Sequence, residues 1–302
     1  METIYEIFFI ENYDMMLLNT IALKFKKAFP DFYQKVLNIK QGRYNYTFSE
    51  DRYPGSFLSN HYQGNYREQK APEVIYCFWT GDNEMSENRK KGLEALEKNA
   101  GVPVKLITPK NLQEYIKEDA PLHKGFDFLS LTMKSDYLRC YFMHHYGGGY
   151  ADVKPFEHSW KFAFNKLNSQ KNKYVIGYPE LLHGGIAPAE HRFFAEKKFY
   201  TDYERQMSVE KYLQQDLMKY TPLLIGNGSF ISKPYSPITT EWYEEVHKRM
   251  DELYDYFYEY GDNQDFEVPY FYLVQIFHPL ILKYHKHVLR DKKLLPILKN
   301  YR

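Results

Sequence analysis

The stretch Val74–Gly81, with the sequence VIYCFWTG, decides the fold class. β-Branched and aromatic residues fill it without a charge and a glycine closes it, so we predict a buried β-strand. A helix follows, with Ser86 as its N-cap and Gly101 as its stop, and a second strand is predicted over Val102–Thr108. The stretch therefore begins a strand–helix–strand unit.

The residues after the second strand continue this alternation. Pro109 is predicted to open another helix, whose apolar residues are Leu112, Tyr115 and Ile116. Strand, helix, strand and helix in close succession are typical of parallel strands covered by helices. We therefore predict an α/β protein with a mixed, mostly parallel sheet flanked by helices.

Two further helices are predicted later in the chain. One covers Thr132–Tyr146 and ends at the glycine run 147–149, after which Tyr150–Val153 is predicted to begin a strand. The other covers Ile238–Tyr260, where apolar residues recur at helical spacing. Its acidic residues are interpreted as a solvated face.

The first 70 residues differ from the rest of the chain. They contain one helical apolar stripe and then a polar, aromatic stretch from Gln41 to Gln69, and the Ala71–Pro72 pair ends them. We predict that residues 1–70 form an N-terminal extension. Residues 71–302 then form the main domain, with helical additions in its C-terminal part.

Composition excludes several classes of function. A formal net charge of +1 over 302 residues lacks the basic footprint of a nucleic-acid-binding protein. Cys77 and Cys140 form neither a disulfide framework nor a metal-type spacing, which favours a reducing, cytoplasmic compartment. No signal peptide is apparent, and the longest apolar run, Val268–Leu282, falls short of the ~20 residues that cross a bilayer.

The last residues of the chain are basic, with leucine and isoleucine between the charges. Two interpretations stay open: peripheral contact with the anionic inner face of the cell membrane, or a terminal helix packed on the core. The basic residues concerned are Lys283, Lys286, Arg290, Lys292, Lys293, Lys299 and Arg302.

The stretch Lys134–Lys154 carries the candidate chemistry. Asp136 and Arg139 are three residues apart on the predicted helix, so their side chains project from one face. On its own such a pair is typical of a surface ion pair. Here a glycine break follows, and Asp152 lies on the next strand, where an α/β sheet gathers ligands at the carboxyl ends of its strands. The parts converge on one site.

This stretch resembles glycosyltransferase family 32 and the related capsular polysaccharide synthesis proteins, whose pattern runs S-D-x-x-R and then G-G-x-Y-x-D-x-D. The resemblance extends over Val74–Phe156 and implies a GT-A-like nucleotide-binding fold. It also implies transfer of a sugar from a nucleotide donor, a UDP-sugar, with retention at the anomeric carbon. The matching residues are Ser135, Asp136, Arg139, Gly147, Gly148, Tyr150 and Asp152.

The same resemblance assigns roles to individual residues. Asp136 and Arg139 would hold the donor sugar and its phosphates, and Asp152 would face the ribose or a metal ion. Trp79 would stack on the base, although a buried core tryptophan is the alternative. The implied donor-binding set is Phe78, Trp79, Thr80, Ser135, Gly147, Gly148, Tyr150 and, on a strand resembling a later family strand, Asn227.

Lys154 departs from the pattern, because the family has an aspartate there that binds Mn²⁺ or Mg²⁺. In one interpretation the Lys154 ammonium contacts the diphosphate directly and takes over part of the work of the metal. In the other, Asp152 still binds a metal with help from a distant histidine. The histidines considered are His278, His285 and His287.

Two further interpretations complete the sequence-based hypothesis. A catalytically inactive module that binds a sugar nucleotide or a glycan is the alternative to an enzyme. His183 and His191 lie in a segment suited to an acceptor loop and are candidates for the acceptor side. The hypothesis is a cytoplasmic glycosyltransferase that extends a surface polysaccharide on a glycan or lipid-linked acceptor.

Overall fold

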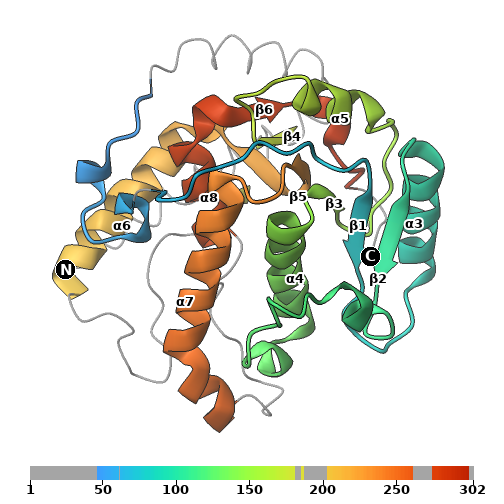
Figure 1. The fold of residues 1–302 in the computed structure, drawn as a ribbon, viewed down its shortest axis with the longest axis horizontal. Helices are drawn as coiled ribbons and strands as arrows, with labels where there is room; N and C mark the ends of the chain where they lie inside the picture. The colour runs from blue at the N-terminus through green and yellow to red at the C-terminus, as the bar shows by residue number, and fades with distance from the viewer. Residues whose placement is uncertain (1–45, 61, 181–184, 187–202, 261–273, 299–302) are drawn as a thin grey trace, which may run out of the picture.

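The computed structural model describes residues 46–60, 62–180, 185–186, 203–260 and 274–298. Six strands form one sheet in the order β2-β1-β3-β5-β4-β6 (Figure 1). Within it β5 pairs antiparallel with β3 and β4, and the other pairings are parallel. The predicted α/β class with a mixed, mostly parallel sheet is confirmed. The strands are β1 Ile75–Phe78, β2 Val104–Ile107, β3 Gly148–Ala151, β4 Val175–Pro179, β5 Ile225–Ser232 and β6 Val288–Arg290.

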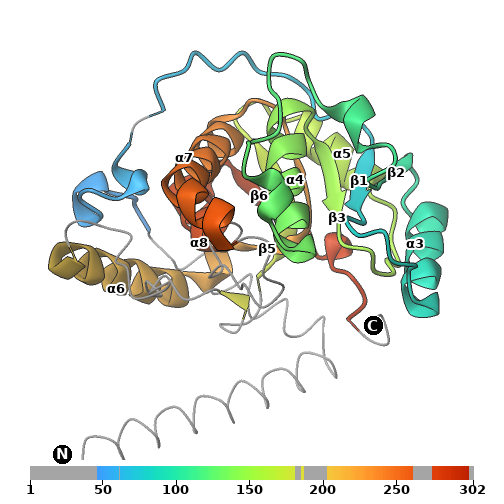
Figure 2. The same cartoon turned by 90° about the horizontal axis from the view of Figure 1, so that it is seen from below.

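Helices cover both faces of this sheet, because successive side chains of each strand alternate between two cores. Tyr76 and Phe78 of β1 enter the core beneath α4, α7 and α8, whereas Ile75 and Cys77 enter the core beneath α3 and α5. Figure 2 shows α3 beside β2 and α6 on the opposite side of the molecule. The helices are α3 Glu87–Asn99, α4 Leu131–His145, α5 Lys161–Asn168, α6 Tyr203–Lys219, α7 Pro237–Tyr260 and α8 Val274–Lys283.

The predicted helix boundaries around β1 are confirmed. The Ser86 side chain accepts a hydrogen bond from the backbone of Arg89 and caps α3, and Gly101 takes a φ of +70° just after its end. The helix that contains Asp136 runs from Leu131 to His145, and Gly147 with a φ of +63° turns the chain into β3. The serine cap and the two glycines thus mark where these helices begin or end.

Two local predictions were wrong. The helix expected after Pro109 is a single 3-10 turn, Leu112–Tyr115, because the Asn111 side chain bonds the backbone of Thr108 and Leu106 and holds a turn. The strand expected over Tyr150–Val153 begins at Gly148 and ends at Ala151. Asp152 therefore lies just beyond the strand rather than within it.

The charged residues of α7 and of the C-terminal segment differ from the predictions. Glu241 and Glu245 of α7 are buried rather than solvated, because Glu241 pairs with Lys283 and Glu245 with Arg249. Residues 288–290 form β6 beside β4 rather than part of a tail or terminal helix. The apolar side chains of Val288 and Leu294 enter the two cores and hold this segment on the sheet.

The described part of the predicted N-terminal extension packs on the helices of the main core. Tyr46, Tyr53 and Leu58 belong to the same hydrophobic cluster as α7 and α8, and Arg52 pairs with Asp216 of α6. The domain boundary at residue 70 stays a prediction. Among the described helices, none has both the length and the apolar character that a membrane crossing requires.

Candidate functional site

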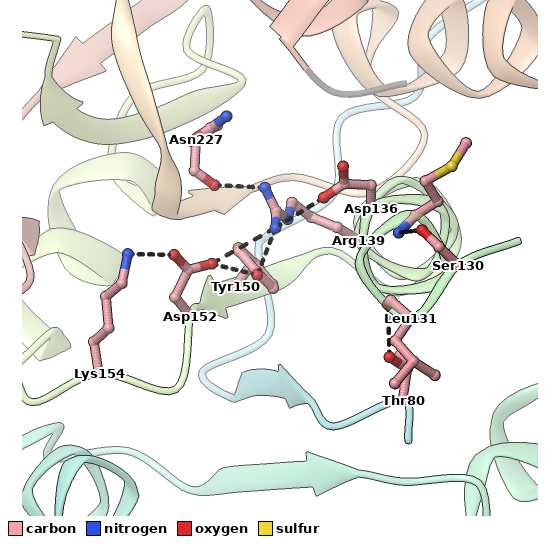
Figure 3. Close-up of polar contacts among 10 residues, drawn as sticks. Thr80, Ser130, Leu131, Asp136, Arg139, Tyr150, Asp152, Lys154 and Asn227 are labelled. Carbon is pink, nitrogen blue, oxygen red and sulfur yellow. Dashed lines mark hydrogen bonds and ion pairs between the residues drawn. The ribbon is translucent and has the colours of Figure 1, made fainter. Parts of the chain in front are cut away.

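The candidate site lies at one edge of the sheet. Trp79 directly follows β1 and Asp152 directly follows β3, so both lie at the carboxyl ends of parallel strands. Asn227 is near the start of β5, which runs antiparallel and therefore begins at the same edge. Figure 3 shows Asp136, Arg139 and Tyr150 beside Asp152 in this region. Ligands of α/β proteins gather at this edge of the sheet.

Arg139 is the centre of the cluster and is almost fully buried. Its Nη2 lies 3.3 Å from Asp136 Oδ1, one helical turn earlier, and 3.6 Å from Asp152 Oδ1. Its Nη1 donates to the carbonyl oxygen of Asn227 at 3.0 Å. The buried Nε has no hydrogen-bond partner in the described part of the chain. The predicted convergence of Asp136, Arg139 and Asp152 is confirmed.

Tyr150 contacts both Arg139 and Asp152. Its ring is 4.0 Å from the guanidinium carbon of Arg139, and its hydroxyl accepts a hydrogen bond from Arg139 Nη2 at 2.6 Å. The same hydroxyl donates to Asp152 Oδ1 at 2.6 Å. Phe78, also buried, stacks on the Tyr150 ring at 5.6 Å. Tyr150 and Phe78 thus pack against the charged groups. Because both are buried, they expose little surface to a ligand.

Lys154 holds the other oxygen of the same carboxylate, with Nζ 2.7 Å from Asp152 Oδ2 (Figure 3). A tight turn brings the two together, because the backbone N–H of Lys154 donates to the Asp152 carbonyl at 2.7 Å. Arg89 of α3 donates to the carbonyl of Val153 at 2.7 Å. A Cβ added at Gly92 would lie only 3.3 Å from the backbone of Lys154. The position of Lys154 is therefore fixed by α3.

Burial and neighbouring charges act differently on the two acids. Burial outweighs the attraction of Arg139 at Asp136 and raises its pKa to about 6. At Asp152 burial also opposes ionisation, but Arg139 and Lys154 together with hydrogen bonds from Lys154 and Tyr150 outweigh it and lower its pKa. Asp152 is thus the permanent anion, and Asp136 gains its charge only as the pH rises through about 6.

These residues do not fit a divalent metal ion held by the protein. Tyr150 and the ammonium of Lys154 already occupy the two oxygens of Asp152, and a second cation, Arg139, lies beside them. The described residues include no group of three His, Cys, Asp or Glu side chains placed to hold a metal. His278 is fully buried against the Ile225 carbonyl.

The other two histidines considered as metal ligands contact backbone oxygens. His285 Nδ1 lies 3.0 Å from the carbonyl oxygen of Leu282, and His287 Nδ1 lies 2.8 Å from that of Asn172. The His287 ring also stacks on Tyr174 at 4.6 Å. His285 is thus held by the end of α8, and His287 by the segment just before β4.

Trp79 and Thr80 lie at the carboxyl end of β1, and Trp79 is partly exposed. Trp79 Nε1 donates to the carbonyl of Asn83 at 2.7 Å, which fixes the ring plane. The Thr80 hydroxyl donates to the carbonyl of Leu131 at 2.7 Å, and the Leu131 side chain is half exposed. A partly exposed aromatic ring held in this way suits a flat, partly apolar ligand such as a base.

The structure does not bring every predicted residue to this cluster. Ser135 lies on α4 next to Asp136, whereas Gly147 and Gly148 lie where β3 begins, at the end of the strand opposite Asp152. A Cβ added at Gly147 would be 2.5 Å from Pro234, so this glycine permits a close approach of two segments. Their role in donor binding stays a prediction. His183 and His191 lie outside the described residues.

Sequence reasoning missed Tyr178, which comes from β4. A Cβ added at Gly228 would lie 3.1 Å from Asp152 Oδ2 and 3.4 Å from the Tyr178 hydroxyl oxygen, so both groups border this glycine. The spacing Gly226-x-Gly228 on β5 is the sequence signal that could have indicated a close approach here. The partner that approaches, Tyr178, carries no motif of its own.

In a comparison with protein families, the model of a family described as capsular polysaccharide synthesis protein matches residues 27–176. The matched range contains Asp136, Arg139, Asp152 and Lys154, and it ends within β4. The match supports a capsule-synthesis family and fits a role in capsule synthesis. A comparison with curated proteins finds no match.

Proposed function

We propose that the protein is a glycosyltransferase that moves a sugar from a nucleotide-sugar donor, a UDP-sugar, to a glycan or lipid-linked acceptor in surface polysaccharide synthesis. The observation that carries the proposal is the charged cluster of Arg139, Asp152 and Lys154 beside Asp136 at the carboxyl edge of the sheet, with Arg139 buried and the other three partly exposed. The family match supports the polysaccharide setting. The choice of UDP and of retention rests on the resemblance of the Asp136–Asp152 segment.

The chemistry of sugar transfer suits this cluster. When the bond between the anomeric carbon and the diphosphate breaks, negative charge grows on the departing diphosphate. Lys154 and Arg139 supply two fixed cations at the carboxyl end of β3, and neither needs to reorient when the bond breaks. Asp136, ionised above a pH of about 6, supplies an acceptor for hydroxyl groups of the sugar.

Lys154 also leads us to propose transfer without a bound metal ion. A lysine in place of the second acid of the family pattern cannot bind Mn²⁺, but its ammonium carries a positive charge to the same region. Asp152 holds that ammonium at 2.7 Å, and α3 fixes the turn on which it lies. In this proposal the carboxylate of Asp152 positions Lys154, and the lysine contacts the diphosphate.

A panel of sugar nucleotides tests the function. UDP-glucose, UDP-galactose, UDP-N-acetylglucosamine and GDP-mannose are added in the presence of chelator, and thermal unfolding and donor hydrolysis are measured. We expect at least one donor to stabilise the fold, by about 2.7 kcal/mol at 100 times its Kd, and to be hydrolysed slowly. Binding without any turnover, with or without an acceptor glycan and Mn²⁺, would identify an inactive binding module instead.

Asp136→Asn is the matched variant for this test, because it keeps the shape of the side chain and removes the charge. We expect turnover to fall by roughly 10²-fold or more, as when a group that stabilises the transition state is lost. Circular dichroism and the melting temperature should show a retained fold. Full activity of Asp136→Asn would remove the residue from the site.

A further inference from the structure

Tyr178 of β4 lies beside the cluster although it is outside the range that the family model matches. The phenol and the Asp152 carboxylate border the same residue, Gly228, at distances of 3.4 and 3.1 Å from an added Cβ. Gly228 also accepts a backbone hydrogen bond from Asp152 at 2.8 Å. A side chain at position 228 would contact both the phenol and the carboxylate, whereas glycine places no atom there.

An irregularity in the pairing of β4 and β5 aims Tyr178 at the site. Gly177 pairs with Phe230, and Pro179 pairs with Ile225. The segment 177–179 of β4 therefore lies opposite the longer segment 225–230 of β5. The Tyr178 ring crosses this stretch, and a Cβ added at Gly226 would fall 2.0 Å from its Cζ atom. Irregular pairing of this kind redirects side chains and is frequent beside functional sites.

The surroundings of the Tyr178 hydroxyl make it a hydrogen-bond donor toward a ligand. Its oxygen is hydrogen-bonded to the backbone of Gly228, which leaves its proton available. Burial, followed by the charges of Glu180 and Asp152, raises the pKa of the phenol well above its ordinary value. The hydroxyl therefore stays protonated around neutral pH.

The order of strands along the edge indicates which part of a donor Tyr178 meets. The sheet places β1 with Trp79 first, then β3 with Asp152 and Lys154, then β5 and β4 with Tyr178. A donor with its base on Trp79 and its diphosphate on Lys154 extends its sugar toward β5 and β4. In this orientation the sugar would approach Gly228, which the Tyr178 hydroxyl borders.

The geometry points to Tyr178 as a specificity-determining residue that donates a hydrogen bond to a hydroxyl group of the transferred sugar. This inference rests on the proposed glycosyltransferase function and extends it beyond the matched range. Because the contact is made to the sugar and not to the nucleotide, it affects the intact donor and leaves the binding of the free nucleoside diphosphate unchanged.

The test compares two ligands on one variant, Tyr178→Phe, which removes only the hydroxyl. Calorimetry is done with the sugar nucleotide from the panel that the wild-type protein binds best and with its free diphosphate, UDP or GDP. We expect Tyr178→Phe to bind the sugar nucleotide about 3- to 10-fold more weakly, the effect of one lost hydrogen bond, with kcat/KM lowered at least as much. Affinity for the diphosphate should stay at the wild-type value.

Tyr174→Phe is the control, because Tyr174 lies just before the start of β4 and stacks on His287 away from the cluster. It should bind both ligands as the wild type does. Equal weakening of both ligands by Tyr178→Phe, or no change in either, would overturn the inference while leaving the proposed function in place. A wild-type protein that binds no sugar nucleotide would overturn both.

Discussion

Among the described residues, the carboxylates of Glu241 and Asp152 each accept hydrogen bonds from a lysine ammonium and a tyrosine hydroxyl, but in different surroundings. At Asp152 the two donors contact separate oxygens, whereas at Glu241 the ammonium contacts both. The first is Glu241 of α7, where Lys283 lies 2.8 Å from Oε2 and Tyr284 donates to Oε1 at 2.6 Å. Lys283 also donates to the carbonyl of Asn60 at 2.6 Å. This group joins α7, α8 and the N-terminal segment, and both charged side chains are only 7% exposed.

The second carboxylate is Asp152, with Lys154 on Oδ2 and Tyr150 on Oδ1. It differs in having a second cation, Arg139, at 3.6 Å and a side chain that is 25% exposed. Burial raises the pKa of Glu241 in spite of its lysine, whereas the added guanidinium keeps the pKa of Asp152 below its ordinary value.

The two groups differ in what surrounds them: the Glu241 group joins elements of the fold, and the Asp152 group is the one at which we propose that a ligand binds. At Glu241 one cation and one anion neutralise each other inside packed helices. Around Asp152 two cations face one permanent anion and Asp136, which burial keeps partly protonated near pH 6, and the Arg139 Nε has no partner among the described residues. Two cations close together, Arg139 and Lys154, suit the diphosphate of a sugar nucleotide.

The largest expected effect is on stability at the first group. Lys283→Met should lower the free energy of unfolding by about 3–5 kcal/mol, because it leaves the Glu241 charge buried without its partner. Urea unfolding at pH 8 measures this change. Donor turnover per folded molecule should stay close to that of the wild type, and a selective loss of turnover would break the distinction between the two groups.

Lys154→Met should show the opposite pattern. Loss of a fixed cation at the departing diphosphate is expected to lower kcat by about 10²- to 10³-fold, equivalent to about 2.7–4 kcal/mol of transition-state stabilisation. The loss of unfolding free energy should be clearly smaller than for Lys283→Met, because Arg139 still neutralises Asp152. Steady-state kinetics and urea unfolding of both variants give the comparison, and a purely structural Lys154 would lower stability and leave kcat unchanged.

The smallest expected effect is a pH dependence near pH 6. As the pH rises, kcat/KM should increase and the contribution of Asp136 to stability should decrease. The raised pKa of Asp136 means that its protonated form favours the folded state, so its contribution to stability is lost as the pH rises through about 6. Donor binding needs the ionised form, so kcat/KM should fall about tenfold per unit below pH 6. Asp136→Asn should remove this acid limb, and an unchanged limb in the variant would assign it to another group.

The sequence predicted the arrangement of the candidate site where its signals are local. Asp136 and Arg139 share a helix face, the glycine at 147 ends that helix, and the strand that follows delivers Asp152 to the edge of the sheet. Each step depends on residues close together in the chain. The α/β class follows for the same reason, because Ser86, Gly101 and the apolar stretches mark the ends of neighbouring elements.

The parts that sequence reasoning missed depend on contacts between distant residues. Glu241 looks like a surface acid on its helix, and only the approach of Lys283 from α8 buries it. Tyr178 reaches the site because β5 departs from regular pairing with β4 at Gly226 and Gly228. The acids on α7 were misread for the same reason, since a helix considered alone shows no partners. Membrane contact by the basic C-terminal residues stays a prediction.

The central claim is that Lys154, held by Asp152, supplies the cation at the diphosphate. Nucleotide binding in the presence of chelator tests this claim most directly. Calorimetric titration with UDP compares the wild type with Lys154→Met and with Lys154→Asp, the variant that restores the second acid of the family pattern. We expect the wild type to bind UDP in EDTA with an affinity that Mn²⁺ does not increase. Lys154→Met should bind UDP roughly tenfold or more weakly. Lys154→Asp should bind UDP only when Mn²⁺ is added. Wild-type binding that disappears in EDTA and returns with Mn²⁺ would contradict the account.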